Sequence, residues 1–126
     1  MIAPAHIHAG GLRYHGAGTI VSQLIKDGYM EGMDIPQLES FQAATLFAQS
    51  EGIIPAPESA HAIAATIREA LKAKEEGVQK NILFCLSGHG LIDMTAYDQY
   101  NAGDLTNYDL PQEVIDQNVA KLEKLV

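Results

Sequence analysis

Residues 80–90, Lys-Asn-Ile-Leu-Phe-Cys-Leu-Ser-Gly-His-Gly, decide how the chain is expected to fold. The apolar run at residues 82–86 is too short for a helix and rich in strand-forming residues, so it predicts a strand covered on both faces. Ser87, Gly88, His89 and Gly90 follow at once. The two glycines favour a tight turn where a ligand can approach the backbone. Ligands bind beyond the carboxyl ends of strands in open α/β sheets, so this turn is a candidate site.

Helical and extended patterns alternate before this stretch, and helical patterns follow it. Further extended segments are expected at residues 29–35 and 53–54. Such alternation predicts one α/β domain over residues 1–126, with a small, mostly parallel sheet of about three strands flanked by helices. In the last helix, Val114, Val119, Leu122 and Leu125 are expected to face inward. Apolar periodicity and terminal glycines place five helices, at residues 19–27, 37–50, 58–76, 93–102 and 110–126.

Composition excludes several classes of partner. The 126 residues carry a net charge of −8, from 16 acidic residues against 8 Lys and Arg. No basic cluster is available to neutralise phosphates, so we expect no nucleic-acid partner. No apolar run approaches the ~20 residues of a membrane helix, so we expect no membrane partner. The single cysteine, Cys85, cannot form an internal disulfide, is expected to be buried and inert, and fits a cytoplasmic location.

Several side chains are candidates for chemistry, each with a simpler structural explanation. Glu58 begins an expected helix, where a carboxylate favours the positive end of the helix dipole. His61 lies one turn later, and a packed or capping histidine is the simpler explanation. Ser87 and His89 are residues that can serve as a nucleophile and a base, but the stretch lacks the first glycine of a nucleophile elbow. A metal site at the pair His6 and His8 lacks the usual third and fourth ligands.

Glu58 and Ser87 are stronger candidates for a shared site when they are considered together. Each follows directly after a segment that is expected to be extended. If the two segments are neighbouring parallel strands, both side chains reach the same edge of the sheet. A carboxylate and a hydroxyl that converge on a glycine-lined crevice could orient a flat, polar cofactor.

Three longer stretches carry a family resemblance, and together they extend over nearly the whole chain. They resemble the C-terminal part of the tryptophan synthase β chain, a pyridoxal-phosphate (PLP) enzyme of fold type II. Arg13, Pro57 and His89 match the second, longer class of β chain, because the common class has Asp where Arg13 stands. The three stretches are Ile-His-Ala-Gly-Gly-Leu-Arg-Tyr-His-Gly at residues 7–16, Glu-Gly-Ile-Ile-Pro-Ala-Pro-Glu-Ser-Ala-His-Ala at residues 51–62 and Leu-Ser-Gly-His-Gly at residues 86–90.

The resemblance implies roles for three residues in cofactor binding. The serine of the family's Ser-Gly loop hydrogen-bonds the pyridine nitrogen of PLP, which implies this role for Ser87, with Gly88 beside it. A neutral hydroxyl partner keeps that nitrogen largely unprotonated. The glutamate of the family's Pro-Ala-x-Glu-Ser motif lies beside the cofactor ring, which implies that place for Glu58. The family's reaction is that of a lyase of tryptophan biosynthesis, which replaces the hydroxyl of L-serine by indole to give L-tryptophan.

The resemblance also implies that important parts of the family's site lie elsewhere. The Schiff-base lysine, the glycine-rich phosphate loop and the mobile domain belong to the N-terminal part of the β chain. None of this chain's lysines stands in a matching context, so no catalytic residue is assigned. The chain is therefore expected to supply the pyridine-nitrogen side of a PLP site and to be inactive alone. An N-terminal partner chain or a homo-oligomer would complete it.

Two other functions stay open at this point. One is a non-catalytic, oligomeric binding or interaction module that reuses half of the fold. The other is a small metal-dependent or hydrolytic enzyme that uses His6, His8, His61 or His89. The sequence assigns no role to His15.

Overall fold

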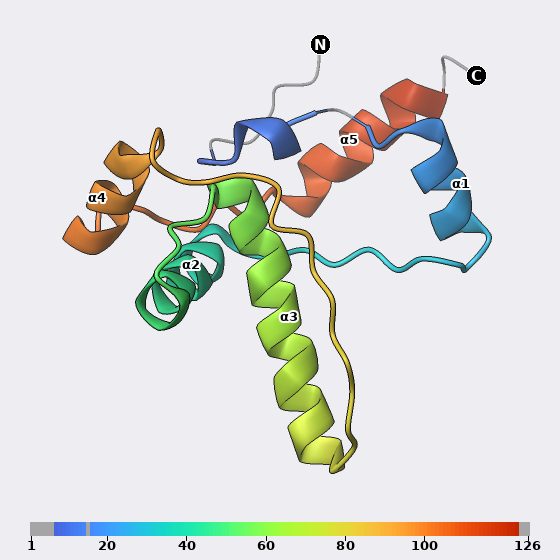
Figure 1. Ribbon diagram of the computed structural model, residues 1–126. Helices are drawn as coiled ribbons and strands as arrows, with labels where there is room; N and C mark the ends of the chain where they lie inside the picture. Colours follow the sequence, from blue (N-terminus) through green and yellow to red (C-terminus); the bar gives the residue numbers. More distant parts are fainter. Residues whose placement is uncertain (1–6, 15, 124–126) are drawn as a thin grey trace.

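The computed structural model describes residues 7–14 and 16–123 (Figure 1). All five expected helices are confirmed, with boundaries shifted by no more than a few residues. His6, His15 and Leu125, which entered the sequence analysis, lie outside the described residues. The elements are the 3-10 helix η1 (Gly10–Leu12) and the α-helices α1 (Thr19–Lys26), α2 (Gln37–Glu51), α3 (Pro57–Glu76), α4 (Met94–Ala102) and α5 (Gln112–Glu123).

The expected α/β fold is wrong for this chain, because its described residues contain no sheet. They hold a single isolated β-bridge, antiparallel, between Pro55 and His89. Residues 82–86 run back alongside α3 as extended chain (Figure 1). A strand needs a neighbouring strand to pair its backbone groups, and none lies beside this segment in the described part of the chain. Leu83 is therefore 94% exposed, and Cys85 is exposed rather than buried.

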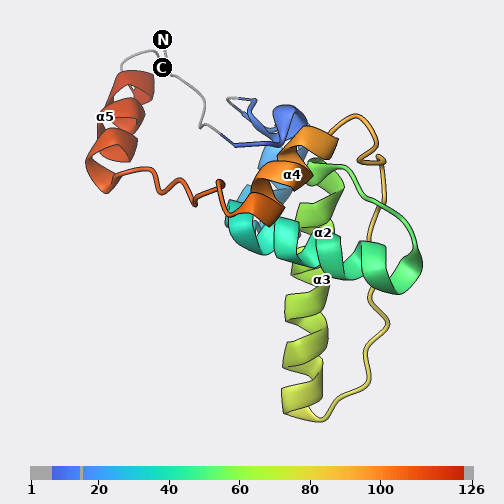
Figure 2. The same cartoon turned by 90° about the vertical axis from the view of Figure 1, so that its left-hand side faces the viewer.

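The core lies where α2 crosses α3 and where α4 covers one end of the crossing (Figure 2). Phe41 of α2 is buried against Tyr97 of α4, with ring centroids 5.2 Å apart and the ring planes at 77°. A second cluster joins Ala43 and Ile63, with Phe47 and Phe84 packed against it. Apolar residues of both long helices thus pack together near their crossing.

Glycine ends both long helices. Gly52 (φ 71°) and Gly77 (φ 67°) take left-handed conformations at the C-termini of α2 and α3. This conformation is nearly free of strain only for glycine, so both residues stop their helices. Pro57 opens α3, where its missing N–H leaves no hydrogen bond unmade.

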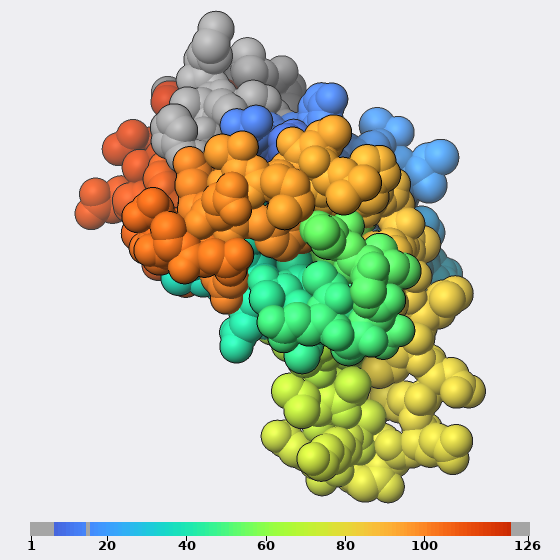
Figure 3. Space-filling model, turned by 60° about the vertical axis from the view of Figure 1, so that its left-hand side comes forward, coloured from blue at the N-terminus to red at the C-terminus, as the bar shows by residue number. Residues whose placement is uncertain are grey.

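Two helices, α1 and α5, contact no other helix within the described residues. Ile20 of α1 is 76% exposed, and Val119 of α5 is 47% exposed. Figure 2 shows α5 standing clear of α2 and α3. The expectation that Val114 and Val119 face inward is therefore wrong, because no helix of the described part of the chain lies under them. In Figure 3 the C-terminal half of α3 and the chain after it also project beyond the body that α2 and α4 form.

Candidate functional site

The turn at residues 87–90 lies against the chain that leads into α3. The Ala56 N–H donates to the Gly88 carbonyl oxygen at 2.9 Å, and the Gly90 N–H donates to the Ile54 carbonyl oxygen at 2.8 Å. Gly90 is buried, and a Cβ there would collide with the Pro55 carbonyl oxygen. The two segments therefore run antiparallel in close contact, and only glycine allows that approach.

Ser59 ties this turn to the N-terminus of α3. Its side chain is buried, and its Oγ accepts a hydrogen bond from the Gly88 N–H at 3.1 Å. The same oxygen lies 3.4 Å from the Ser87 Oγ, so the two hydroxyls form a hydrogen bond in which either can donate. The Ser87 hydroxyl is thereby held at the N-terminal end of α3, next to Ser59.

The Glu58 side chain turns the other way, toward η1. Its Oε1 accepts a hydrogen bond from the Gly11 N–H at 2.9 Å. A Cβ on Gly11 would lie 3.3 Å from the Glu58 Cγ, so the carboxylate arm rests directly on the glycine backbone. Glu58 and Ser87 therefore have separate partners, Gly11 and Ser59. The structure brings the two segments together through an antiparallel bridge, whereas the sequence suggested parallel neighbouring strands.

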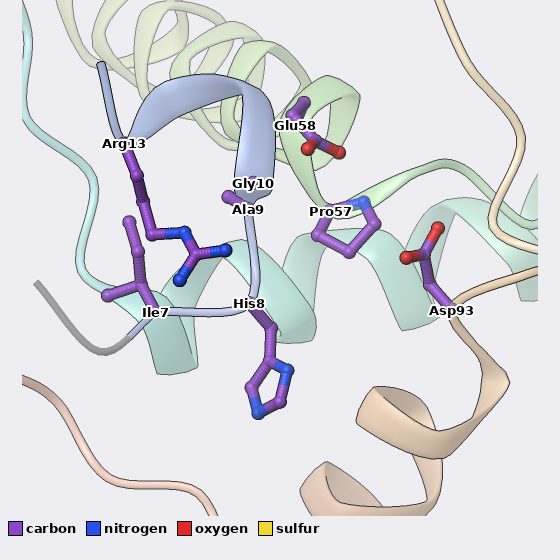
Figure 4. A pocket seen from close by; sticks show the side chains of 8 residues that line it. All are labelled: Ile7, His8, Ala9, Gly10, Arg13, Pro57, Glu58 and Asp93. Atoms are coloured by element: carbon purple, nitrogen blue, oxygen red, sulfur yellow. The ribbon is translucent and has the colours of Figure 1, made fainter. Parts of the chain in front are cut away.

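A cavity of about 600 Å³ opens between η1, the start of α3 and the start of α4. Figure 4 shows the Arg13 guanidinium and the Glu58 carboxylate on either side of the η1 ribbon, with Asp93 beyond Pro57. Arg13 folds back over Gly10, since its Nη2 would lie 3.7 Å from a Cβ placed there. The cavity thus offers one cation and two carboxylates to a small polar ligand. Its lining consists of Ile7, His8, Ala9, Gly10, Arg13, Pro57, Glu58 and Asp93.

Sequence reasoning did not single out Ser59, Gln37 or Asp93. Gln37 is buried, and its Oε1 accepts the His8 N–H at 2.8 Å, which fixes the loop that forms one wall of the cavity. Asp93 stands at the N-cap position of α4, where acidic residues are common, so the pattern carried no separate functional signal. Ser59 is a small hydroxyl residue in the first turn of a helix. In the sequence, this was the only indication that it could make a buried polar contact.

The histidines do not form a catalytic or metal-binding group in the described residues. His61 packs against its own helix, with Nδ1 2.7 Å from the Pro57 carbonyl oxygen and 3.2 Å from the Ser40 Oγ. His89 uses Nδ1 to accept the Leu91 N–H at 3.3 Å. No cluster of three or more metal-ligating side chains occurs among the described residues. Over the same residues, no helix is both long and apolar enough to cross a membrane.

The chain is similar to tryptophan synthase beta chains. It is 63% identical over 94 residues to tryptophan synthase beta chain 2 of Thermotoga maritima, a match that covers 75% of this chain and 22% of the relative. It is 58% identical over 104 residues to tryptophan synthase beta chain 2 of Aquifex aeolicus, which covers 82% of this chain and 24% of the relative. No family model matches the chain. The chain thus spans about a quarter of the length of the curated relatives that it matches.

Proposed function

Because this chain belongs to the tryptophan synthase beta chain family and corresponds to about a quarter of a full-length relative, we propose that it forms one wall of a PLP site. Ser87 would hold the pyridine nitrogen of the cofactor, Gly88 would lie beside it, and Glu58 would stand near the ring. A further polypeptide would supply the remaining walls. The proposed reaction joins L-serine and indole to give L-tryptophan and water.

The observation that carries this proposal is the contact of Ser59 with the turn at residues 87–90. It holds the Ser87 hydroxyl in place from one side only, because the Ser87 residue is exposed. A hydroxyl that is positioned by a buried neighbour and still open to solvent can hydrogen-bond an incoming ligand without losing its support. Glu58 lies in the first turn of α3, and Ser87 contacts Ser59 of the same turn.

The residues fit the ring side of PLP in their chemistry. A serine hydroxyl is a neutral partner, so it can bind a pyridine nitrogen without forcing a proton onto it. When bound, PLP supplies the electron sink that lets the hydroxyl of serine be replaced by indole. Glu58 keeps Gly11 and the wall formed by η1 close to that place. Neither the lining of the cavity beside Glu58 nor the stretch at residues 86–90 contains a lysine, so the covalent anchor of the cofactor is assigned to the further polypeptide.

The exposed apolar chain at residues 82–86 supports the need for such a polypeptide. Leu83 is 94% exposed and Leu86 is 39% exposed, although strand-forming apolar residues gain free energy by being covered. Their backbone groups are also available to a neighbouring strand. We propose that the further polypeptide covers this segment.

Complementation tests this proposal. The chain is mixed with PLP and with the part of the Thermotoga maritima relative that lies outside the 94 matched residues, and tryptophan formation from serine and indole is measured. We expect activity in the mixture and in neither component alone. Ser87→Ala should lower that activity at least tenfold, whereas Ser50→Ala, an exposed serine on α2 that bonds only its own helix, should leave it unchanged. A stable complex without activity would contradict the proposal.

A further inference from the structure

Tyr97 of α4 is buried, and its hydroxyl bonds the chain segment that faces the turn at residues 87–90. The hydroxyl donates to the Pro55 carbonyl oxygen at 2.6 Å, and Pro55 is buried as well. A buried carbonyl oxygen that lost its donor would be strongly destabilised, because it cannot exchange the lost bond freely for one to water. The Tyr97 hydroxyl is therefore an important partner of this segment.

The Pro55 carbonyl group and the Ala56 N–H belong to one peptide unit. This unit is trans and planar, so a hydrogen bond that fixes the carbonyl oxygen at one edge also fixes the direction of the N–H at the other edge. The Ala56 N–H donates to the Gly88 carbonyl oxygen at 2.9 Å. The orientation that the Tyr97 hydroxyl gives to this peptide unit is thus passed on to the turn at residues 87–90.

Gly88 is held by both of its backbone polar groups. Its carbonyl oxygen accepts the Ala56 N–H, and its own N–H donates to the Ser59 Oγ at 3.1 Å. That N–H lies in the peptide unit that joins Ser87 to Gly88, so the two contacts together determine where Ser87 lies. Ser59 supplies one of these supports directly, and Tyr97 stabilises the other from the opposite segment.

The ring of Tyr97 is itself fixed by packing. It lies edge-to-face against Phe41 of α2, and its Cε2 would be 3.0 Å from a Cβ placed on Gly90. Gly90 leads directly into α4, because its carbonyl oxygen accepts the Asp93 N–H at 2.9 Å. Helix α4 therefore follows the turn and folds back onto it, so that one side chain contacts both segments of the antiparallel bridge.

The Tyr97 hydroxyl keeps its proton at neutral and moderately alkaline pH. Burial, and to a smaller extent the Asp93 carboxylate, raise the pKa of Tyr97 to about 12. Only the protonated hydroxyl can donate to a carbonyl oxygen, so the bond to Pro55 persists over that range.

We propose that Tyr97 is a positioning residue for the Ser87 hydroxyl. Its own hydroxyl is engaged by the carbonyl group of the peptide unit at residues 55–56 and acts through that unit and Gly88. The inference rests on the proposed role of Ser87 at the pyridine nitrogen of PLP. Without the Tyr97 hydroxyl, the turn stays attached through Ser59 but takes several orientations, so the Ser87 hydroxyl meets the cofactor less often.

Backbone ¹⁵N relaxation of the full chain without PLP tests the positioning itself. Tyr97→Phe keeps the ring and its packing on Phe41 but removes the hydroxyl. We expect the order parameters of the Ser87 and Gly88 amides to fall from about 0.85 to below about 0.6, while those of α2 and α3 stay unchanged. Tyr100→Phe is the matched control, because it removes a hydroxyl from the same helix and its ring also stacks on Phe41. Unchanged order parameters of the turn in Tyr97→Phe would overturn the proposal.

A double-mutant cycle links this positioning to the cofactor. In the complementation mixture with the Thermotoga maritima part, kcat is measured for Tyr97→Phe, for Ser87→Ala and for the double variant. A residue that acts through Ser87 should lower kcat about fivefold when the Ser87 hydroxyl is present and should have no further effect once it is removed. Equal factors in the two backgrounds would mean that Tyr97 supports only the fold, which contradicts the proposal. An inactive mixture would count against the proposed function, whereas the order parameters would still decide whether Tyr97 positions the turn.

Discussion

Glu58 and Gly11 are 47 positions apart in sequence, yet the carboxylate of one accepts the backbone N–H of the other at 2.9 Å. This contact holds η1 against the first turn of α3 and so forms the wall of the cavity that Arg13 and Asp93 share. A glycine at position 11 leaves room for the carboxylate arm. The residue proposed to stand near a cofactor ring therefore also organises the loop beside it.

Two substitutions of Glu58 distinguish the effect of its hydrogen-bond acceptor from the effect of its negative charge. Glu58→Ala removes the acceptor, so Gly11 amide hydrogen exchange should become about tenfold faster, as a loss of ~1.4 kcal/mol implies. Glu58→Gln keeps a carbonyl oxygen in place and should change exchange much less. Equal exchange rates in both variants and in the parent chain would show that this bond does not hold the loop.

Ser59 should be important for stability as well as for the site. Ser59→Ala leaves the half-buried Gly88 N–H without its acceptor, which costs about 1–3 kcal/mol. The urea midpoint should fall accordingly. Ser50→Ala is the matched control, because the Ser50 hydroxyl is exposed and bonds only the Leu46 and Phe47 carbonyl oxygens of its own helix. If the two variants unfold at the same urea concentration, the link between α3 and the turn is not stabilising.

Gly90 should tolerate no side chain. A Cβ there meets the Pro55 carbonyl oxygen and lies 3.0 Å from Tyr97 Cε2, so Gly90→Ala must push the two segments apart. We expect a loss of about 1–3 kcal/mol in the free energy of unfolding. Gly32→Ala, where nothing lies within 4 Å, should be close to neutral. Thermal unfolding of both variants measures the difference, and a neutral Gly90→Ala would contradict the close approach.

The ion pair between α2 and α3 should make stability sensitive to acid. Hydrogen bonds from Arg68, one of them 2.6 Å long, hold the pKa of the Glu39 carboxyl below its ordinary value of 4.5. A lowered pKa in the folded state means that the stabilisation is present above pH 4.5 and is lost as the pH falls through the lowered pKa. Glu39→Gln should remove this part of the acid dependence in urea titrations. The pair is partly exposed, so added salt should weaken the effect.

The helices could be predicted from the sequence because their signals are local. Gly52 and Gly77 mark helix ends, and the spacing of Ile63 and Ile67 marks a buried face, so α2 and α3 follow from the chain itself. A strand is different, because its stability comes from another strand. Residues 82–86 have the composition of a buried strand, but no segment lies beside them in the described part of the chain.

The sequence predicted that the segments of Glu58 and Ser87 come together, but for a different reason than the one the structure gives, and the cofactor-binding roles of these residues stay a prediction. The sequence suggested that Glu58 and Ser87 converge at the edge of a parallel sheet. The structure brings their segments together through Ser59 and one antiparallel bridge. No pattern in the sequence identified Ser59 as the connection, because a hydroxyl contact between residues 28 positions apart leaves no periodic signal.

A chimera tests the central claim most directly. The matched part of this chain replaces the corresponding 94 residues of the full-length Thermotoga maritima relative. PLP-dependent tryptophan formation from serine and indole is then measured in this chimera and in its Ser87→Ala variant. We predict an active chimera whose kcat falls at least tenfold in Ser87→Ala, while Ser50→Ala has no effect. A folded chimera that binds PLP and works equally well without the Ser87 hydroxyl would contradict the claim that this chain holds the ring side of the cofactor.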